Sequence, residues 1–133
     1  MAVLPFVDTN VLLYLIADDA TKAGRAEQLL AGRVVISVQV LNEFANVARR
    51  KHSLAWHELG QVLADIRHFA EVHPLTLPVH EHGLVLAQRY QLSLYDAMIA
   101  AAALAAGCST LMSEDFQHGQ VLDGRLVIVN PFA

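Results

Sequence analysis

The chain has 133 residues, of which 55% are hydrophobic and 17% are charged. This length fits one domain, 1–133, and this composition favours a packed core over a disordered chain. Nine basic against thirteen acidic residues give a net charge of −4, which offers no overall attraction to nucleic acid or acidic membranes. Cys108 is the only cysteine, which excludes an intramolecular disulfide and a metal site of several cysteines.

The apolar runs of the chain do not match membrane or export signals. The first run is interrupted by Pro5, ends at Asp8 and has no basic residue before it, unlike a secretory signal peptide. The longest run, Ala97–Ala106, has ten residues, whereas a membrane-spanning helix needs about 20. We therefore expect a cytoplasmic protein without a membrane span.

Short apolar runs alternate along the chain with segments in which apolar residues have helical spacing. In chain order, the pattern predicts a strand at Ala2–Val7, helices around 12–16 and 26–30, a strand at Val34–Ser37, helices around 40–47 and 59–69, an edge strand at His73–Leu77, helices around 84–87 and 94–107, and strands at Ser109–Met112 and Leu126–Val129. Apolar strands separated by helices are typical of a parallel sheet covered on both faces. The predicted class is α/β, a three-layer sandwich around a parallel sheet of four or five strands.

Acidic residues follow the predicted strands at the edge where such a sheet binds ligands. Asp8 directly follows the first strand, and the pair Glu114 and Asp115 follows a later one. Glu43 and Asp96 lie near the beginnings of two predicted helices. The fold would therefore gather several carboxylates around one edge of the sheet.

Each acid also has an ordinary structural explanation. Asp8 is a favoured helix N-cap, and Asp96 completes a capping box with Ser93. The pair at 114 and 115 reads as loop carboxylates, and Glu43 lies at the border of an apolar helix face. Independent caps need not converge, however, and clustered carboxylates repel one another unless a cation is present. Hard oxygen ligands suit Mg²⁺ or Mn²⁺, so the cluster predicts a site for one of these ions.

Other kinds of site lack the residues that they need. The seven histidines include no His-Glu-x-x-His spacing, which argues against a zinc enzyme. After the first strand the chain reads Asp8-Thr9-Asn10-Val11 instead of a glycine-rich loop, which argues against a nucleotide cofactor.

The acid-bearing segments resemble those of the PIN-domain nucleases, specifically the VapC-type toxins of bacterial toxin–antitoxin pairs. The matching segments are Val7-Asp8-Thr9-Asn10, Asn42-Glu43-Phe44, Tyr95-Asp96-Ala97 and Ser113-Glu114-Asp115. The endings Gln117-His118-Gly119-Gln120 and Asn130-Pro131-Phe132 are similar to one branch of that family. The resemblance implies a PIN-like three-layer α/β/α fold and an endoribonuclease that cleaves RNA with metal-activated water.

The resemblance also assigns roles to individual residues. It implies that four acids are both catalytic residues and ligands of Mg²⁺ or Mn²⁺: Asp8, Glu43, Asp96 and Asp115. It places Asn10 and Ser113 in supporting positions, and it leaves Glu114 open as a second carboxylate beside the fourth acid.

Substrate and partners are the least specified part of the prediction. The basic run Arg49, Arg50 and Lys51 would contact RNA, although cations at a helix C-terminus also simply complement the helix dipole. The family resemblance implies a homodimer that is inhibited by a VapB-like antitoxin.

Two other functions compete with that of a type II toxin ribonuclease. One is a catalytically silent PIN-like module that binds RNA or protein, but such a module is expected to have lost one or more of the four acids. The other is a phosphatase with Asp8 as nucleophile, which lacks a second aspartate because Asn10 stands two positions later.

Overall fold

The structure is a computed structural model, and it describes residues 3–133. Its elements in chain order are β1 (Phe6–Val7), α1 (Thr9–Leu12), the 3-10 helix η1 (Leu13–Leu15), α2 (Ala20–Ala31), β2 (Val34–Ser37), α3 (Val38–Arg50), α4 (Trp56–Phe69), β3 (Ala70–His73), α5 (Leu77–Tyr90), α6 (Leu94–Ala105), β4 (Thr110–Met112), β5 (Val121–Leu122) and β6 (Leu126–Val129). Among these residues, no helix is both long and apolar enough to cross a membrane.

The strands form one sheet in the order β3-β2-β1-β4-β6-β5. The five strands from β3 to β6 in this order are parallel, and β5 is antiparallel to β6. The chain builds the sheet outward from β1 in one direction through β2 and β3, then returns to place β4 and β6 on the other side. The switch in direction therefore lies between β1 and β4, which is where parallel sheets place their ligand sites.

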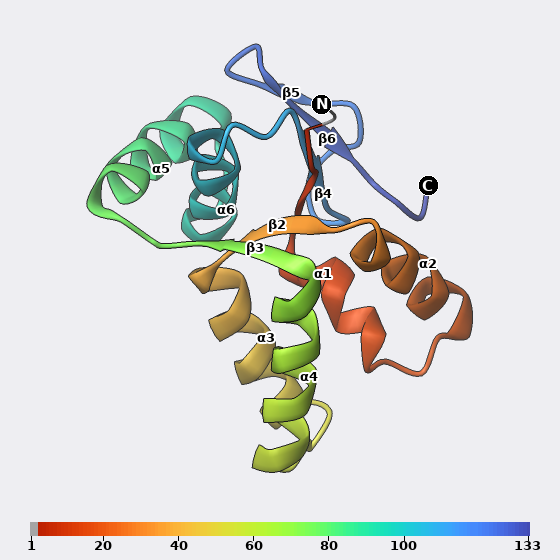
Figure 1. The fold of residues 1–133 in the computed structure, drawn as a ribbon. Helices are drawn as coiled ribbons and strands as arrows, with labels where there is room; N and C mark the ends of the chain where they lie inside the picture. The colour runs from red at the N-terminus through yellow and green to blue at the C-terminus, as the bar shows by residue number, and fades with distance from the viewer. Residues whose placement is uncertain (1–2) are drawn as a thin grey trace.

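Helices cover both faces of this sheet. As Figure 1 shows, α5 and α6 lie together on one side, and α1 to α4 lie on the other. The predicted three-layer α/β/α arrangement is confirmed. All four residues of β2 are buried, as expected for a strand covered on both faces.

The helix that carries Asp96 is packed unusually closely. Eight residues of α6, five of them alanines, are buried. On the neighbouring helix α5, a Cβ atom added to Gly83 would lie 2.5 Å from Sδ of Met98, so only glycine fits there without a shift of that methionine. Gly107 has φ +77° just after the C-cap Ala106, and the amide of Cys108 donates to the carbonyl of Ala103, so α6 ends in a Schellman motif.

Three strands differ from the prediction. The edge strand predicted at His73–Leu77 is wrong: β3 ends at His73, because Pro74 has no amide hydrogen for the ladder, and Leu77 already begins α5. The strand predicted at Ala2–Val7 is shorter, Phe6–Val7, with residues 1–2 outside the described part. The two-residue antiparallel strand β5 was not predicted, since two residues carry no periodicity, and it brings the sheet to six strands.

Candidate active site

Three aspartates meet at the switch point of the sheet. Asp8 follows β1, Asp115 follows β4, and Asp96 lies in the first turn of α6. One carboxylate oxygen from each lies within 4.8 Å of the other two. We call these three residues the acid group. They line a cleft of about 220 Å³, the acid cleft, together with Glu43 and other residues of α1 and α3.

The carboxylate of Asp8 is buried and held by three donors. Its Oδ1 atom accepts a hydrogen bond of 2.7 Å from the amide of Thr9, which makes Asp8 the N-cap of α1. Its Oδ2 atom accepts from the Ser113 hydroxyl at 2.8 Å and from the Asn10 side chain at 3.2 Å. Asp8 is therefore both a helix cap and a member of the acid group, and the two predicted supporting residues both contact it.

Asp96 combines a capping role with a place in the acid group in a different way. Its backbone amide donates to the hydroxyl of Ser93, the N-cap of α6, at 3.2 Å. The capping contact therefore uses the backbone of Asp96, and its carboxylate lies among the other acids.

The local electrostatics disfavour ionisation of these acids. Burial raises the pKa of Asp8 to about 7, with a further contribution from the charges of Asp96 and Glu43, although hydrogen bonds from Ser113 and Thr9 act in the opposite direction. Burial also raises the pKa of Asp96, and the nearby carboxylates add to that shift. Among residues 3–133, no lysine or arginine forms an ion pair with the acid group.

Glu43 faces the acid cleft but stands slightly apart from the three aspartates. Its Oε2 atom accepts from the Thr9 hydroxyl at 2.9 Å, and its Oε1 atom accepts from the Gln39 side chain at 2.8 Å. The sequence patterns did not point to Thr9 or Gln39 as site residues. Gln39 could have been found from the sequence, because it precedes Glu43 by four residues and such residues lie on the same face of a helix.

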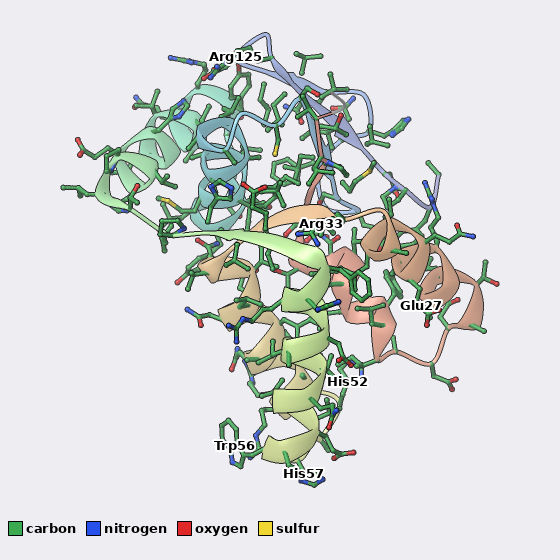
Figure 2. All side chains as sticks on the ribbon, in the orientation of Figure 1. Glu27, Arg33, His52, Trp56, His57 and Arg125 are labelled. Atoms are coloured by element: carbon green, nitrogen blue, oxygen red, sulfur yellow. The ribbon has the colours of Figure 1, made fainter. Side chains whose placement is uncertain are left out.

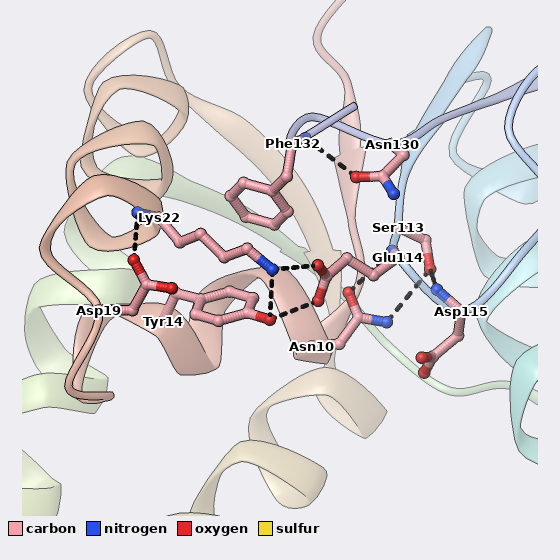
Figure 3. A network of polar contacts seen from close by, with 9 residues as sticks. All are labelled: Asn10, Tyr14, Asp19, Lys22, Ser113, Glu114, Asp115, Asn130 and Phe132. Atoms are coloured by element: carbon pink, nitrogen blue, oxygen red, sulfur yellow. Dashed lines mark hydrogen bonds and ion pairs between the residues drawn. The ribbon is translucent and has the colours of Figure 1, made fainter.

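Glu114 is separated from the acid group although it precedes Asp115. Figure 3 shows its carboxylate turned toward Lys22 and Tyr14, which donate to it at 2.8 and 2.6 Å. Burial alone would raise the pKa of Glu114, but the hydrogen bonds from Lys22 and Tyr14 outweigh burial and lower it. The Lys22 ammonium also lies 5.1 Å from the ring centroid of Phe132. The structure thus brings Asp115, and not Glu114, into the acid group.

The predicted RNA-contacting residues lie at the far end of α3. The Arg49 guanidinium donates to the carbonyl of Leu54 at 2.7 Å and lies 4.1 Å from the ring centroid of Trp56. Figure 2 shows Trp56 at the end of the α3 and α4 pair that is farthest from the sheet. Arg49 therefore fastens the turn between these helices, whereas Arg50 and Lys51 are exposed.

Comparison with known proteins agrees with this geometry. The PIN domain family model matches residues 6–121. The chain belongs to the PIN-domain family. A comparison with curated proteins gave no significant match.

Several solved PIN-like structures share the fold. A toxin–antitoxin complex from Klebsiella pneumoniae aligns with a TM-score of 0.72 and 22% identity, covering 96% of this chain and 97% of that one. VapC20 of Mycobacterium tuberculosis, a toxin that cleaves the sarcin–ricin loop, aligns with a TM-score of 0.66 and 24% identity over 83% of this chain and 88% of its own. VapBC2 of Rickettsia felis, bound to a promoter DNA fragment, aligns with a TM-score of 0.68 and 18% identity, covering 94% of this chain and 96% of that one. At these identities the likeness establishes the fold.

Proposed function

We propose that this PIN-domain protein is a divalent-metal-dependent endoribonuclease, the toxin component of a type II toxin–antitoxin pair. The observation that carries the proposal is the acid group, in which three carboxylates converge within 4.8 Å at the ligand-binding edge of the sheet. Burial of Asp8 without a neighbouring basic side chain is costly for a purely structural residue. A cation supplied from solution would offset that cost.

The donor set fits Mg²⁺ or Mn²⁺. Both ions prefer oxygen ligands, and Mg²⁺ in particular is held by a few carboxylates together with water and substrate phosphate. Asp8, Asp96 and Asp115 would hold the ion, and the acid cleft leaves room beside them for a phosphodiester. When bound there, a divalent ion lowers the pKa of water and polarises the phosphate.

The residues of the chain would position the reacting groups. Thr9, Asn10 and Ser113 hold the Asp8 carboxylate in one orientation through their hydrogen bonds. Each oxygen of Glu43 already accepts one hydrogen bond, and a carboxylate oxygen has room for a second. Glu43 would therefore orient a water molecule at the cleft and accept its proton as the water oxygen bonds to phosphorus. The bond from phosphorus to the 3′ oxygen breaks in the same step, and the departing 3′ oxygen takes a proton from solvent.

The comparisons support RNA and an antitoxin as partners. One structurally similar protein is a toxin that cleaves the sarcin–ricin loop, and others are complexes of toxin with antitoxin. We propose that a VapB-like antitoxin inhibits this chain and that the chain forms a homodimer. The alternative of a catalytically silent RNA- or protein-binding module is disfavoured, because all four acids are present and line one cleft.

A cleavage assay tests the proposal. Wild-type protein, incubated with structured and single-stranded RNA, should cut in the presence of Mg²⁺ or Mn²⁺ and stop when EDTA is added. Attack by water with departure of the 3′ oxygen predicts 5′-phosphate and 3′-hydroxyl ends, whereas attack by the ribose 2′-hydroxyl would leave a cyclic phosphate.

Variants of matched chemistry make the assay specific. Asp96→Asn should lower the cleavage rate at least about 1,000-fold, because metal binding supplies several kcal/mol of transition-state stabilisation. Asp123→Asn, which removes a carboxylate outside the cleft, should cut at the wild-type rate. Cleavage that survives EDTA or Asp96→Asn would contradict the mechanism.

A further inference from the structure

A second hollow opens beside the acid cleft. It has a volume of about 300 Å³ and is lined by Gln39, Asn42, Glu43, Asn46, Leu75 and Tyr95. Glu43 and Asn46 also line the acid cleft, so the two hollows adjoin each other. We call the second hollow the side groove. Whatever chain lies across the acid group can therefore place its neighbouring unit in this groove.

Tyr95 offers an aromatic ring to the side groove. It directly precedes Asp96, and its side chain is exposed, with 68% of its surface accessible. Its carbonyl accepts a hydrogen bond of 3.1 Å from the Gln39 side chain, which also donates to Glu43. The backbone that carries the ring is therefore held by the same amide that donates to Glu43.

Two asparagines of α3 supply unused hydrogen-bonding groups. Asn42 and Asn46 are four residues apart and therefore lie on one face of the helix, and both line the side groove. Neither side chain hydrogen-bonds to another residue in the described range 3–133. An amide side chain both donates and accepts, which is the requirement for reading the edge of a nucleobase.

The lining also indicates what does not bind there. The described residues of the side groove include no lysine or arginine, and Glu43 adds a negative charge at its entrance. A phosphate group would be repelled, whereas a neutral planar heterocycle would find an aromatic face, an aliphatic contact from Leu75 and amide groups at its edge.

We propose that the side groove binds the base of one nucleotide next to the cleaved phosphate of single-stranded RNA. Tyr95 stacks on the base, and Asn42 and Asn46 hydrogen-bond to its edge, so these residues set base preference. This inference rests on the proposed ribonuclease function, which supplies the phosphate in the adjoining acid cleft.

A binding experiment tests the groove separately from catalysis. The probe is a short single-stranded RNA that carries fluorescent 2-aminopurine at one position, bound in the presence of Ca²⁺ so that binding is read without turnover. Wild-type protein should quench the fluorescence, as stacking on an aromatic ring does. Tyr95→Ala should weaken binding at least about fivefold and lose the quenching, since stacking on an aromatic side chain stabilises each base by roughly 1–3 kcal/mol.

Two matched variants distinguish stacking from a local disturbance. Tyr95→Phe keeps the ring and should bind and quench like the wild type. Leu94→Ala removes an exposed side chain from the same turn of α6 and should also leave binding unchanged. The inference is overturned if wild type neither binds nor quenches the probe, or if Tyr95→Ala binds it as tightly as wild type. It is equally overturned if Tyr95→Ala changes only the molecular mass measured by light scattering, because the groove would then be a contact between copies of the chain.

Cleavage of an RNA of randomised sequence, read by sequencing the products, measures the predicted base preference. Asn42→Ala and Asn46→Ala should each flatten the preference at one position beside the cut, measured as the ratio among the cleavage products of the same variant and not as its total cleavage rate. An identical preference in wild type and both variants would contradict the role of the asparagines. Failure of the wild type to cleave any RNA would overturn the ribonuclease proposal, and the fluorescence result would still decide whether the groove binds a base.

Discussion

The acid group and the turn that contains Asp123 both place carboxylates near strand ends, but only the turn supplies basic side chains as partners. Asp123 lies between β5 and β6, and Arg89 donates to it at 2.6 Å. His82 lies 3.0 Å from its other oxygen, and the Tyr90 hydroxyl accepts from its amide at 2.7 Å. Burial alone would raise the pKa of Asp123, but hydrogen bonds from His82, Arg89 and Tyr90 lower it.

The difference shows what each carboxylate does for the fold. Asp123 fastens the β5 and β6 turn to α5 and is stabilised as an anion by side chains of the chain itself. Asp8 and Asp96 have raised pKa values and no basic partner among the described residues. A buried acid that folding leaves uncompensated is typical of a functional site, whereas a compensated one is typical of a structural contact.

The pH dependence of stability offers the strongest way to break this comparison. The pKa of Asp8 is raised to about 7 in the folded protein, so between about pH 4 and pH 7 the folded chain binds a proton that the unfolded chain has lost. The metal-free protein should therefore lose stability as pH rises through this interval, by about 4 kcal/mol if Asp8 acts alone.

Urea unfolding in EDTA at several pH values measures this loss. Asp8→Asn should flatten the decline, and Asp123→Asn should leave its slope between pH 5 and 7 intact. A decline of equal slope in wild type and Asp8→Asn would mean that another group is responsible.

Metal should remove the same penalty. Mn²⁺ binds the gathered carboxylates better than the dispersed carboxylates of the unfolded chain, so it should stabilise the fold by about 2.7 kcal/mol at a concentration 100 times its Kd. Thermal melts at increasing Mn²⁺ follow this effect. Asp96→Asn should blunt the rise in Tm while Asp123→Asn keeps it. An undiminished rise in Asp96→Asn would show that Asp96 is only a helix residue and not a ligand.

The structural aspartate should behave in the opposite manner. Asp123→Asn loses the charge that pairs with Arg89 and should lower the free energy of unfolding by about 1 kcal/mol at neutral pH. Because the pKa of Asp123 is lowered in the fold, its stabilisation is present above the unfolded pKa and disappears as pH falls through the folded pKa. Denaturant unfolding should show that the difference in free energy of unfolding between variant and wild type is smaller in acid than at pH 7. If the difference in free energy of unfolding between Asp123→Asn and wild type is the same in acid as at pH 7, the loss comes from altered packing and not from the lost charge.

The smallest expected effect concerns the basic C-terminal end of α3. Arg50→Gln with Lys51→Gln should lower the salt dependence of RNA binding by about 0.7 in log–log slope for each phosphate that these side chains neutralise. Arg49 is unsuitable for this test, since it is bound to Leu54 and Trp56. Binding titrations at several salt concentrations give the slope. An unaltered slope would leave Arg50 and Lys51 with only their role at the helix C-terminus.

The positions of the acids could be predicted because topology alone decides where they go. Asp8 directly follows β1 and Asp115 lies three residues after β4, so parallel pairing of β1 with β4 brings them to the same edge of the sheet. Asp96 needs only the beginning of α6 to be placed correctly, and Ser93 marks that beginning in the sequence.

The partners of individual side chains could not be predicted from the order of strands and helices. Whether Glu114 or Asp115 joins the acid group depends on Lys22, which is 92 residues away and reaches Glu114 through the packing of α2. No periodicity encodes such a pair. The edge strands were missed or shifted for a related reason, since β5 has only two residues and the bounds of β3 depend on its pairing with β2.

The contact between Gly83 and Met98 offers a way to adjust the position of Asp96 by substitution outside the cleft. A methyl group at position 83 would displace the flexible end of Met98, and a thioether adapts readily to such a change. A bulkier side chain would reach the Met98 backbone, 3.5 Å from the added Cβ and two residues beyond Asp96. Graded substitution at this apolar position would thus shift the start of α6 and the carboxylate of Asp96 by small steps, without altering a single polar atom of the cleft.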